Sequence, residues 1–344
     1  MESAKSRFLR YVTYYTTADD FTGTSPSTER QKDLGNVLMQ ELEALRLEDV
    51  HMDDCGNVLA TLPASEGVDA PVIALIAHMD TAPDASGENV KPRLVRYEGG
   101  ELKLNDTVSL TEALCPGLES HVGEELIVTD GTTLLGADDK AGVAEIMAAV
   151  ETMIEKNVKH GEVRVIFTTD EEIGNGVDGL DVQELGCDYG YTVDGGPLGE
   201  IEFENFNAAS AVLTVHGVGV HPGSAKDAMI NASNVAMEFH MALPVMARPE
   251  TTEGYQGFYH LCQMYGDVTT AKLGYILRDH DAAKLQFKKD NMQDIADYLN
   301  GKYGAGTVEV EIKDSYRNML EKIKPHFHLI ELSLIHISEP TRRS

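Results

Sequence analysis

The stretch Val163–Gly174, VRVIFTTDEEIG, decides the fold prediction. Its first five residues form a mostly apolar run of the length expected for a buried strand. Asp170, Glu171 and Glu172 follow this run. Like charges repel one another where a buried strand ends unless an opposite charge lies among them. The stretch therefore indicates either a solvated turn or one edge of a ligand site.

Two other apolar runs end at residues that can bind ligands. Pro71–Ala77 is followed by His78, and Tyr189–Val193 is followed by Asp194. Apolar side chains at helical spacing lie between the runs or before them, over residues 29–47 and 140–154. Strands that alternate with helices predict an α/β domain with right-handed crossovers.

The pattern changes after Phe206. Alternating strand-like and helix-like segments follow in the order β-α-β-β-α-β, which is typical of a compact α+β domain of the ferredoxin-like kind. We expect this domain to be an insert at residues 208–316.

Composition excludes several classes of partner. The formal net charge of −29, from 57 acidic and 28 basic residues, argues against nucleic acid or an anionic membrane. The four cysteines form no CxxC pair, which argues against a thiolate zinc site or a disulfide framework. No run approaches the roughly 20 apolar residues of a membrane-spanning helix, and the N-terminus lacks the pattern of a secretory signal. We therefore expect a cytoplasmic protein, and 344 residues suggest two domains.

Acidic or histidine residues recur in four segments at or near the ends of predicted elements: His78 with Asp80, Asp138 with Asp139, Glu171 with Glu172, and Asp194. In open α/β sheets the carboxyl ends of the strands line the ligand crevice, so the four segments should converge. Convergent carboxylates require positive charge among them, which a pair of divalent metal ions supplies. One imidazole with several carboxylates suits zinc, with cobalt or manganese as substitutes.

The spacing suggests a role for each side chain. His78 would bind one metal, and Asp80, two residues further, would orient the imidazole. Asp138 would bridge two metals, and Glu172 and Asp194 would complete one site each. Glu171 would then be free to act as the general base that activates water.

Simpler structural roles compete with these assignments. Asp138 or Asp139 could cap the helix that follows, and Asp194 could be only a turn residue. The sequence gives Asp170 no role.

At these residues the sequence resembles the peptidase T family, the tripeptide aminopeptidase branch of the dizinc exopeptidases. The motifs AHMDT, LLGADDKAG, DEEIG and VDGG occur in the family's order and spacing. The resemblance implies a zinc-exopeptidase-like mixed sheet with helices on both faces, with two zinc ions per subunit. It implies His78, Asp138, Glu172 and Asp194 as metal ligands, Asp80 as orienter and Glu171 as base. The choice of Asp138 over Asp139 as the bridge comes from the resemblance.

The resemblance also implies that the insert is a lid and dimerisation domain, so that the protein forms a homodimer. His221 and Asn231 in VHPGSAKDAMINA match positions that reach the substrate, and Arg278 in YILRDHD matches a position that binds the substrate's terminal carboxylate. Arginine offers a planar fork suited to a carboxylate. Without the resemblance, His221 could be an ordinary loop residue and Arg278 a partner in a surface ion pair.

The resemblance stops near Leu332. Family members supply a last histidine ligand after a Gly-rich turn, and this chain contains neither, so we expect a truncated, weakly active form. His326 and His328 are not expected to replace that ligand. The expected domains are residues 1–207, the first part of the catalytic domain; 208–316, the lid; 317–332, the start of the return; and 333–344, an adapter-like, non-native tail.

The expected function is metal-dependent removal of the N-terminal residue from short peptides, chiefly tripeptides. Two alternatives stay open. One is another dizinc hydrolase, a carboxypeptidase or an N-acyl amino acid deacylase. The other is an inactive truncated homologue that dimerises through its lid.

Overall fold

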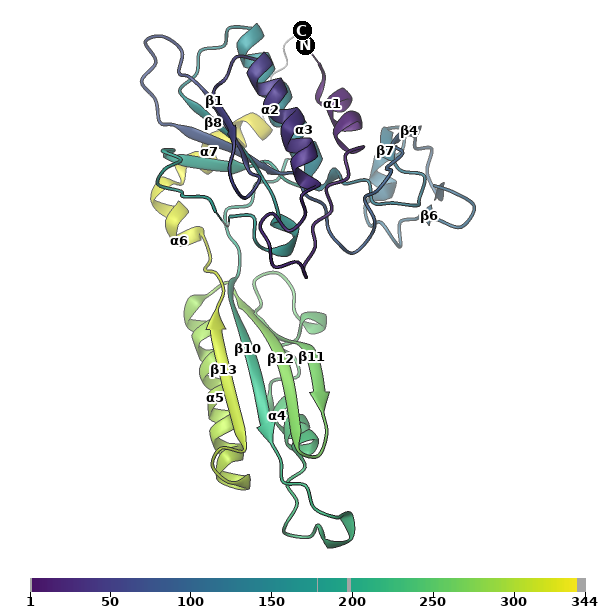
Figure 1. Ribbon diagram of the computed structural model, residues 1–344, viewed down its shortest axis with the longest axis vertical. Coiled ribbons are helices and arrows are strands. Elements are labelled where there is room, and N and C mark those ends of the chain that lie inside the picture. The colour runs from purple at the N-terminus through teal and green to yellow at the C-terminus, as the bar shows by residue number, and fades with distance from the viewer. Residues whose placement is uncertain (1, 178, 197–198, 339–344) are drawn as a thin grey trace. The chain divides into compact units, whose positions relative to one another are not determined.

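The computed structural model describes residues 2–177, 179–196 and 199–338. The chain divides into two compact units, Met1–Gly196 and Pro197–Ser344 (Figure 1). In the described part of the chain, no helix combines the length and the apolar character needed to cross a membrane.

The first unit is built on a five-stranded mixed sheet in the order β1-β2-β8-β3-β9. The strands are β1 (Glu48–Met52), β2 (Val58–Leu62), β3 (Ile73–His78), β8 (Val163–Thr168) and β9 (Tyr189–Thr192). β3 runs parallel to β8 and β9, whereas β2 runs antiparallel to β1 and β8. The carboxyl ends of β3, β8 and β9 therefore meet at one edge of the sheet.

Three helices pack with this sheet around the main core of the first unit. They are α1 (Ala4–Tyr11), α2 (Gln31–Ala44) and α3 (Ala137–Glu155) (Figure 1). On α2, Leu34, Leu38 and Leu42 recur every four residues and are fully buried, as one face of a helix requires. Alternate residues of β2, from Val58 to Leu62, are buried in the same core.

A smaller excursion separates β3 from α3. It contains two short two-stranded sheets, formed by β4 (Arg93–Arg96) with β7 (Glu125–Val128) and by β5 (Leu102–Lys103) with β6 (Ser109–Leu110). It has a core of its own around Tyr97, Leu102, Leu118 and Val128. The sequence pattern predicts none of these strands, because two- to four-residue strands are too short to show a periodic pattern.

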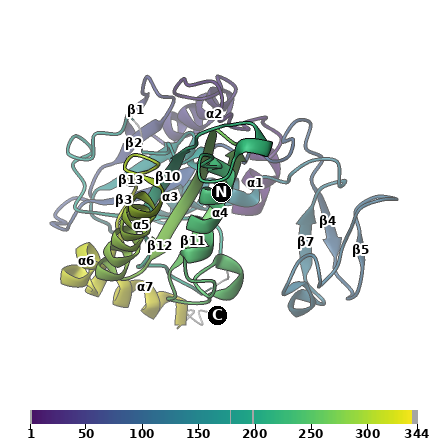
Figure 2. The same ribbon diagram turned by 90° about the horizontal axis from the view of Figure 1, so that it is seen from below.

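The second unit contains a four-stranded antiparallel sheet in the order β11-β12-β10-β13. Its elements follow one another as β10 (Asn207–His216), α4 (Ala232–Ala242), β11 (Phe258–Gly266), β12 (Thr270–Asp279), α5 (Ala282–Tyr303) and β13 (Val308–Asp314). α4 and α5 share one core with the sheet (Figure 2). This is the predicted β-α-β-β-α-β order, with the first and third strands adjacent at the centre of the sheet.

Local sequence explains the helix starts in this unit. The side chain of Asn231 accepts a hydrogen bond from the backbone N–H of Asn234 at the start of α4. Asp281 does the same for Ala283 and Lys284 at the start of α5. Side-chain caps of this kind satisfy N–H groups that a helix cannot satisfy internally.

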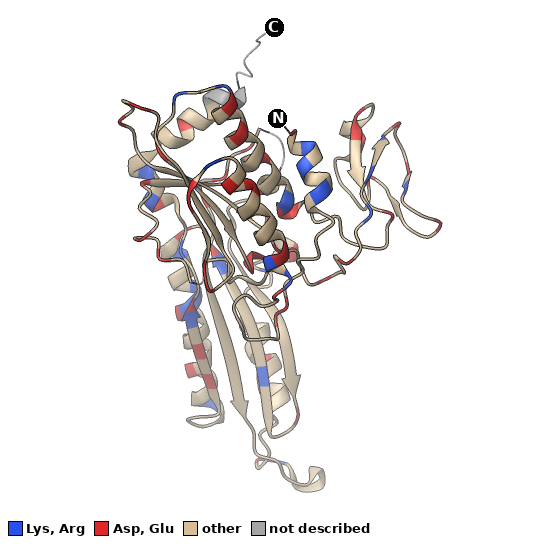
Figure 3. Ribbon diagram, turned by 45° about the horizontal axis from the view of Figure 1, so that its top comes forward, with Lys and Arg blue, Asp and Glu red and all other residues tan. Residues whose placement is uncertain are grey.

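The predicted mixed α/β fold is confirmed, and the domain limits at residues 207, 208, 316 and 332 stay predictions. After β13 the structure continues with α6 (Leu320–Ile323) and α7 (His328–Ser338). α7 runs across residue 333, where the tail was expected to begin, and residues 339–344 of that tail lie outside the described part of the chain. Acidic side chains are distributed over elements of both units rather than gathered in one segment (Figure 3).

Candidate metal centre

Four separate segments of the first unit meet at the carboxyl edge of its parallel strands. His78 is the last residue of β3, and Asp138 and Asp139 lie in the first turn of α3. Glu171 and Glu172 form a short turn directly after β8, and Asp194 follows β9. The convergence that the strand ends predicted is therefore present.

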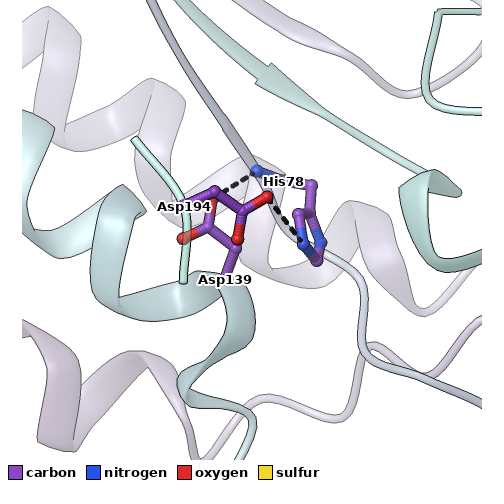
Figure 4. A group of neighbouring side chains, drawn as sticks. All are labelled: His78, Asp139 and Asp194. Carbon is purple, nitrogen blue, oxygen red and sulfur yellow. Dashed lines mark hydrogen bonds and ion pairs between the residues drawn. The ribbon is translucent and has the colours of Figure 1, made fainter. Parts of the chain in front are cut away.

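The convergence is tight enough for metal ligation. His78 Nε2 lies 2.9 Å from Asp138 Oδ1, 3.8 Å from Asp194 Oδ2 and 3.9 Å from Glu171 Oε2. In two groups of three residues, the donor atoms of the group all lie within 4.8 Å of one another. One group is His78, Asp138 and Glu172, and the other is His78, Asp139 and Asp194. Figure 4 shows the second group, with both carboxylates on the same side of the imidazole.

Asp80 lies between His78 and the turn that carries Glu171 and Glu172. Its carboxylate is fully buried, and Oδ1 lies 3.3 Å from His78 Nδ1. Oδ1 also accepts a hydrogen bond from the N–H of Glu171, and Oδ2 accepts one from the N–H of Glu172, both at 3.1 Å. Asp80 is thus placed to orient the imidazole and to hold the acidic turn after β8.

The acids raise one another's pKa. Burial and the charge of Asp194 raise the pKa of Asp139 to about 8. Burial is the largest cause of the raised pKa of Glu171, Glu172 and Asp194, and neighbouring carboxylates add to it. A bound cation would relieve this repulsion.

His78 experiences the same negative charge. Burial lowers the pKa of His78, but Asp80, followed by Asp139 and Asp194, outweighs it and raises that pKa to about 10. A divalent cation in place of the proton would satisfy the same field, with neutral imidazole as its ligand. The donor set of one imidazole and several carboxylates therefore fits a divalent metal.

Asp139 and Asp138 differ in exposure and in their hydrogen bonds. Asp139 is 1% exposed, and its carboxylate accepts hydrogen bonds of 3.1 Å from the N–H groups of His78 and Gly142. It therefore joins the first turns of α3 to the end of β3. Asp138 has a side chain that is 63% exposed and faces His78, so its carboxylate is the more available of the two.

Gly142 explains how α3 comes so close to β9. A Cβ atom built there would lie 1.9 Å from the carbonyl oxygen of Val193 and 2.4 Å from Asp139 Oδ1. Only glycine leaves room for this approach. The last glycine of GADDKAG thus brings the start of α3 beside Asp194.

Two buried residues near the site were not predicted. Lys140 is 1% exposed, its Nζ donates to the carbonyl oxygen of Tyr14, and burial lowers its pKa to about 7. Asp170, which the sequence analysis left without a role, is also 1% exposed. Lys140 lies within a quoted motif, but no pattern in a single sequence reveals that its ammonium is buried.

The three predicted substrate-binding residues lie in the second unit. His221 is exposed, and its Nδ1 accepts a hydrogen bond from the N–H of Gly223. Asn231 caps α4. Arg278 is partly buried on β12, donates to the carbonyl oxygen of Leu277 and stacks over the ring of Tyr316 at 5.1 Å. Each has a local structural role, and their role in binding a substrate stays a prediction.

Comparisons with known proteins agree with this fold. Residues 203–306 match the family described as the peptidase dimerisation domain. The chain is 48% identical over 337 residues to a protein named Peptidase T from Alkaliphilus oremlandii, with 96% of this chain and 82% of the relative covered. It is 50% identical over 331 residues to a Peptidase T from Geobacillus kaustophilus, with 95% and 80% covered.

Solved structures show the same fold. The structure of the aminopeptidase PepT from Bacillus cereus matches with a TM-score of 0.69 at 24% identity, and covers 92% of this chain and 76% of its own. A tripeptidase from Staphylococcus aureus matches with the same TM-score at 23% identity and the same coverage.

The fold and the acid-rich site define a metallopeptidase, a class of hydrolases. Within this class, the chain belongs to the peptidase T family.

Proposed function

We propose that this protein is a metal-dependent aminopeptidase that releases the N-terminal residue of short peptides, chiefly tripeptides. The observation that carries the proposal is the convergence of His78, Asp138, Glu172 and Asp194 around one edge of the sheet, with Glu171 beside them. Family membership and the names of the relatives support the tripeptide substrate.

The four ligand residues would hold two zinc ions, with cobalt or manganese as substitutes. Asp138 would be the ligand that the two ions share, a role supported by its place beside Glu172 in one donor group and by its charge, which raises the pKa of Asp194 after burial. Bound divalent cations supply Lewis-acid activation of water and of the peptide carbonyl.

Glu171 has the position and the freedom of a general base. Its side chain is about half exposed, and its carboxylate accepts no hydrogen bond from the described part of the chain. Burial and neighbouring acids raise its pKa, so it holds a proton more readily than an ordinary glutamate. It can take a proton from the attacking water and return it to the leaving amine.

Residues of the second unit would recognise the peptide. His221 would donate to the oxyanion that forms on the scissile carbonyl, with Asn231 close to it in the sequence. Arg278 would bind the terminal carboxylate of the peptide and would thereby select for short peptides.

A substrate panel tests the proposal. The metal-loaded chain should cleave free tripeptides and lose turnover when their N-terminus is acetylated, because an aminopeptidase needs the free amine. A carboxypeptidase or an N-acyl amino acid deacylase would tolerate that block. Failure on every tripeptide, despite bound metal, would contradict the aminopeptidase and favour a non-catalytic dimerising protein.

We also propose that the protein forms a homodimer through its second unit, as the match to a dimerisation domain suggests. β11 is an edge strand with exposed Met264 and Tyr265, and Met237 and Met241 are exposed on α4. The opposite edge, β13, instead carries charged side chains that discourage strand pairing. β11 and α4 therefore form the more suitable interface.

A further inference from the structure

Asp170 is a buried acid directly before the two glutamates of the site. It is 1% exposed and adopts a left-handed backbone conformation, with φ of 60°. The proposed function gives this side chain no task, because its carboxylate is absent from both metal-binding groups. Its contacts show what it does instead.

Among the described residues, the donors to the Asp170 carboxylate come from the segment before α2 and from the first residue of that helix. Oδ2 accepts a hydrogen bond of 2.6 Å from the N–H of Ser27. Oδ1 accepts one of 2.5 Å from Ser27 Oγ and one of 2.6 Å from Gln31 Nε2. The N–H of Asp170 donates back to Gln31 Oε1 at 3.1 Å. Ser27 and Gln31 are themselves buried, so water does not compete for these bonds.

The same turn is held on its other side by Asp80. The N–H groups of Glu171 and Glu172 donate to the two oxygens of Asp80, as described above. The turn closes with a hydrogen bond from the N–H of Asn175 to the carbonyl oxygen of Asp170. Two carboxylates, Asp170 and Asp80, thus determine where the backbone of Glu171 and Glu172 lies.

We infer that Asp170 is a positioning residue that sets the direction of Glu171 and Glu172 toward the metal centre through its anchor to Ser27 and Gln31. The inference rests on the proposed function for the roles of the two glutamates. Asp170 itself touches neither metal nor substrate. Because side chains on a turn follow its backbone, a turn released at Asp170 would misplace a metal ligand and the base together.

The chemistry of the anchor requires a carboxylate. All three partners of the Asp170 oxygens are donors, so an amide at this position would turn its NH₂ group toward at least one of them. Asparagine tolerates the left-handed conformation as well as aspartate does. Asp170→Asn therefore removes the anchor without altering the backbone preference.

The contact with Gln31 allows a rescue. In the double variant Asp170→Asn/Gln31→Glu, the amide NH₂ at position 170 can donate to the new carboxylate at position 31 and to the hydroxyl of Ser27, while the amide oxygen accepts from the N–H of Ser27. The new carboxylate can still accept from the N–H of residue 170. The net charge is unchanged, and each group in the pair again has a partner of the opposite kind.

Metal binding by the metal-free full chain, measured by titration calorimetry with Zn²⁺ and Co²⁺, tests the inference. Asp170→Asn should lose about 10- to 100-fold in affinity, as loss of an outer hydrogen-bond partner typically does. It should also change the visible spectrum of bound Co²⁺. The double variant should recover most of the affinity and the wild-type spectrum.

A control separates positioning from plain destabilisation. Tyr11→Phe removes a hydrogen bond to Glu41 between α1 and α2, away from the site. It should lower the unfolding temperature while metal affinity stays unchanged. If Asp170→Asn behaved in the same way, with a lower unfolding temperature but unchanged affinity and spectrum, Asp170 would be only structural.

Hydrogen exchange distinguishes failure of this inference from failure of the proposed function. In metal-free protein, the amides of Glu171 and Glu172 should exchange faster in Asp170→Asn and slow again in the double variant. If the wild-type chain bound no divalent metal but the two variants showed these changes in exchange, the proposed metal chemistry would be contradicted and the anchor supported. Unchanged exchange in Asp170→Asn would overturn the anchor.

Discussion

Glu171 and Glu172 are neighbours in the sequence that differ in their place in the site. Glu172 belongs to a donor group with His78 and Asp138, whereas Glu171 belongs to neither donor group and has its Oε2 3.9 Å from His78 Nε2. Identical side chains can therefore divide ligation and proton transfer between them. The backbone bonds to Asp80 place them, since both N–H groups point to one carboxylate.

Glu171→Gln provides the residue-scale prediction. The amide keeps the shape of the side chain but cannot take a proton, so kcat should fall about 10²- to 10⁴-fold. Metal content, measured by elemental analysis, should match wild type, because the proposed function gives Glu171 no metal to bind. Glu172→Gln is the comparison, and it should lose metal as well as activity. Normal turnover by the Glu171→Gln variant would show that Glu171 is not the general base.

The residues that could be predicted from the sequence were those that follow a strand or precede a helix in a recognisable motif. His78, Asp138, Glu172 and Asp194 are of this kind, and the structure brings them together. The hydrogen bond that Asp139 accepts from the N–H of His78 and the role of Asp170 could not be predicted in this way. The partner residues lie elsewhere in the chain, and Asp170 meets Ser27 across 143 positions. A long-range hydrogen bond has no periodic signature.

At the scale of elements, the second unit depends on a buried ion pair between a strand and a helix. Lys288 of α5 and Asp279 of β12 form an ion pair of 2.6 Å, and both side chains are largely buried. Asp279 Oδ1 also accepts a hydrogen bond from the N–H of Asp281, the residue that caps α5. The pair therefore joins the end of the strand to the helix that follows.

Lys288→Met should destabilise this unit by about 3–5 kcal/mol, because it leaves the Asp279 carboxylate buried without its cation. Denaturant unfolding followed by circular dichroism measures the loss. Lys289→Met is the matched control. Its partner Asp314 is exposed, so the cost should stay at about 0–1 kcal/mol. Equal effects at the two positions would show that the buried pair has no special weight.

The helix ranges predicted from the sequence agree with the structure where the apolar residues are regularly spaced. The helix expected over 29–47 is α2 (Gln31–Ala44), and the helix expected over 140–154 lies within α3. α3 begins earlier, with non-helical backbone at Asp138 and Asp139, because its first turn is shaped by the site rather than by apolar spacing. The excursion between β3 and α3 escaped prediction since its strands are very short.

At the scale of the whole molecule, an acidic chain contains one unit that would bind metal and one that would bind a second copy. The net charge of −29 comes from acids in both units, so the carboxylates of the metal centre account for only part of it. Two such chains would repel one another at low ionic strength. An interface between them therefore needs apolar contact, and α4 and β11 offer it.

Met241→Glu should shift the protein from dimer to monomer, because it adds a charge to the exposed apolar face of α4. Light scattering during size-exclusion chromatography gives the mass. Tyr298→Glu, on the exposed face of α5, adds the same charge outside the proposed interface and should leave the mass unchanged. Dimers of equal stability in both variants would place the interface elsewhere.

The bonds to Asp80 and Asp170 also have a consequence for folding kinetics. They join residues 91, 92, 139 and 143 positions apart, and each requires β8 to be aligned with segments made much earlier in the chain. Contacts at such separation form slowly, since a long loop must close before any of them is gained. We therefore expect the acidic turn to acquire its geometry late in folding, after β3 and β8 have found their register. Nascent chains would present these carboxylates as a loose polyanion first, and as a cation site only once the sheet is complete.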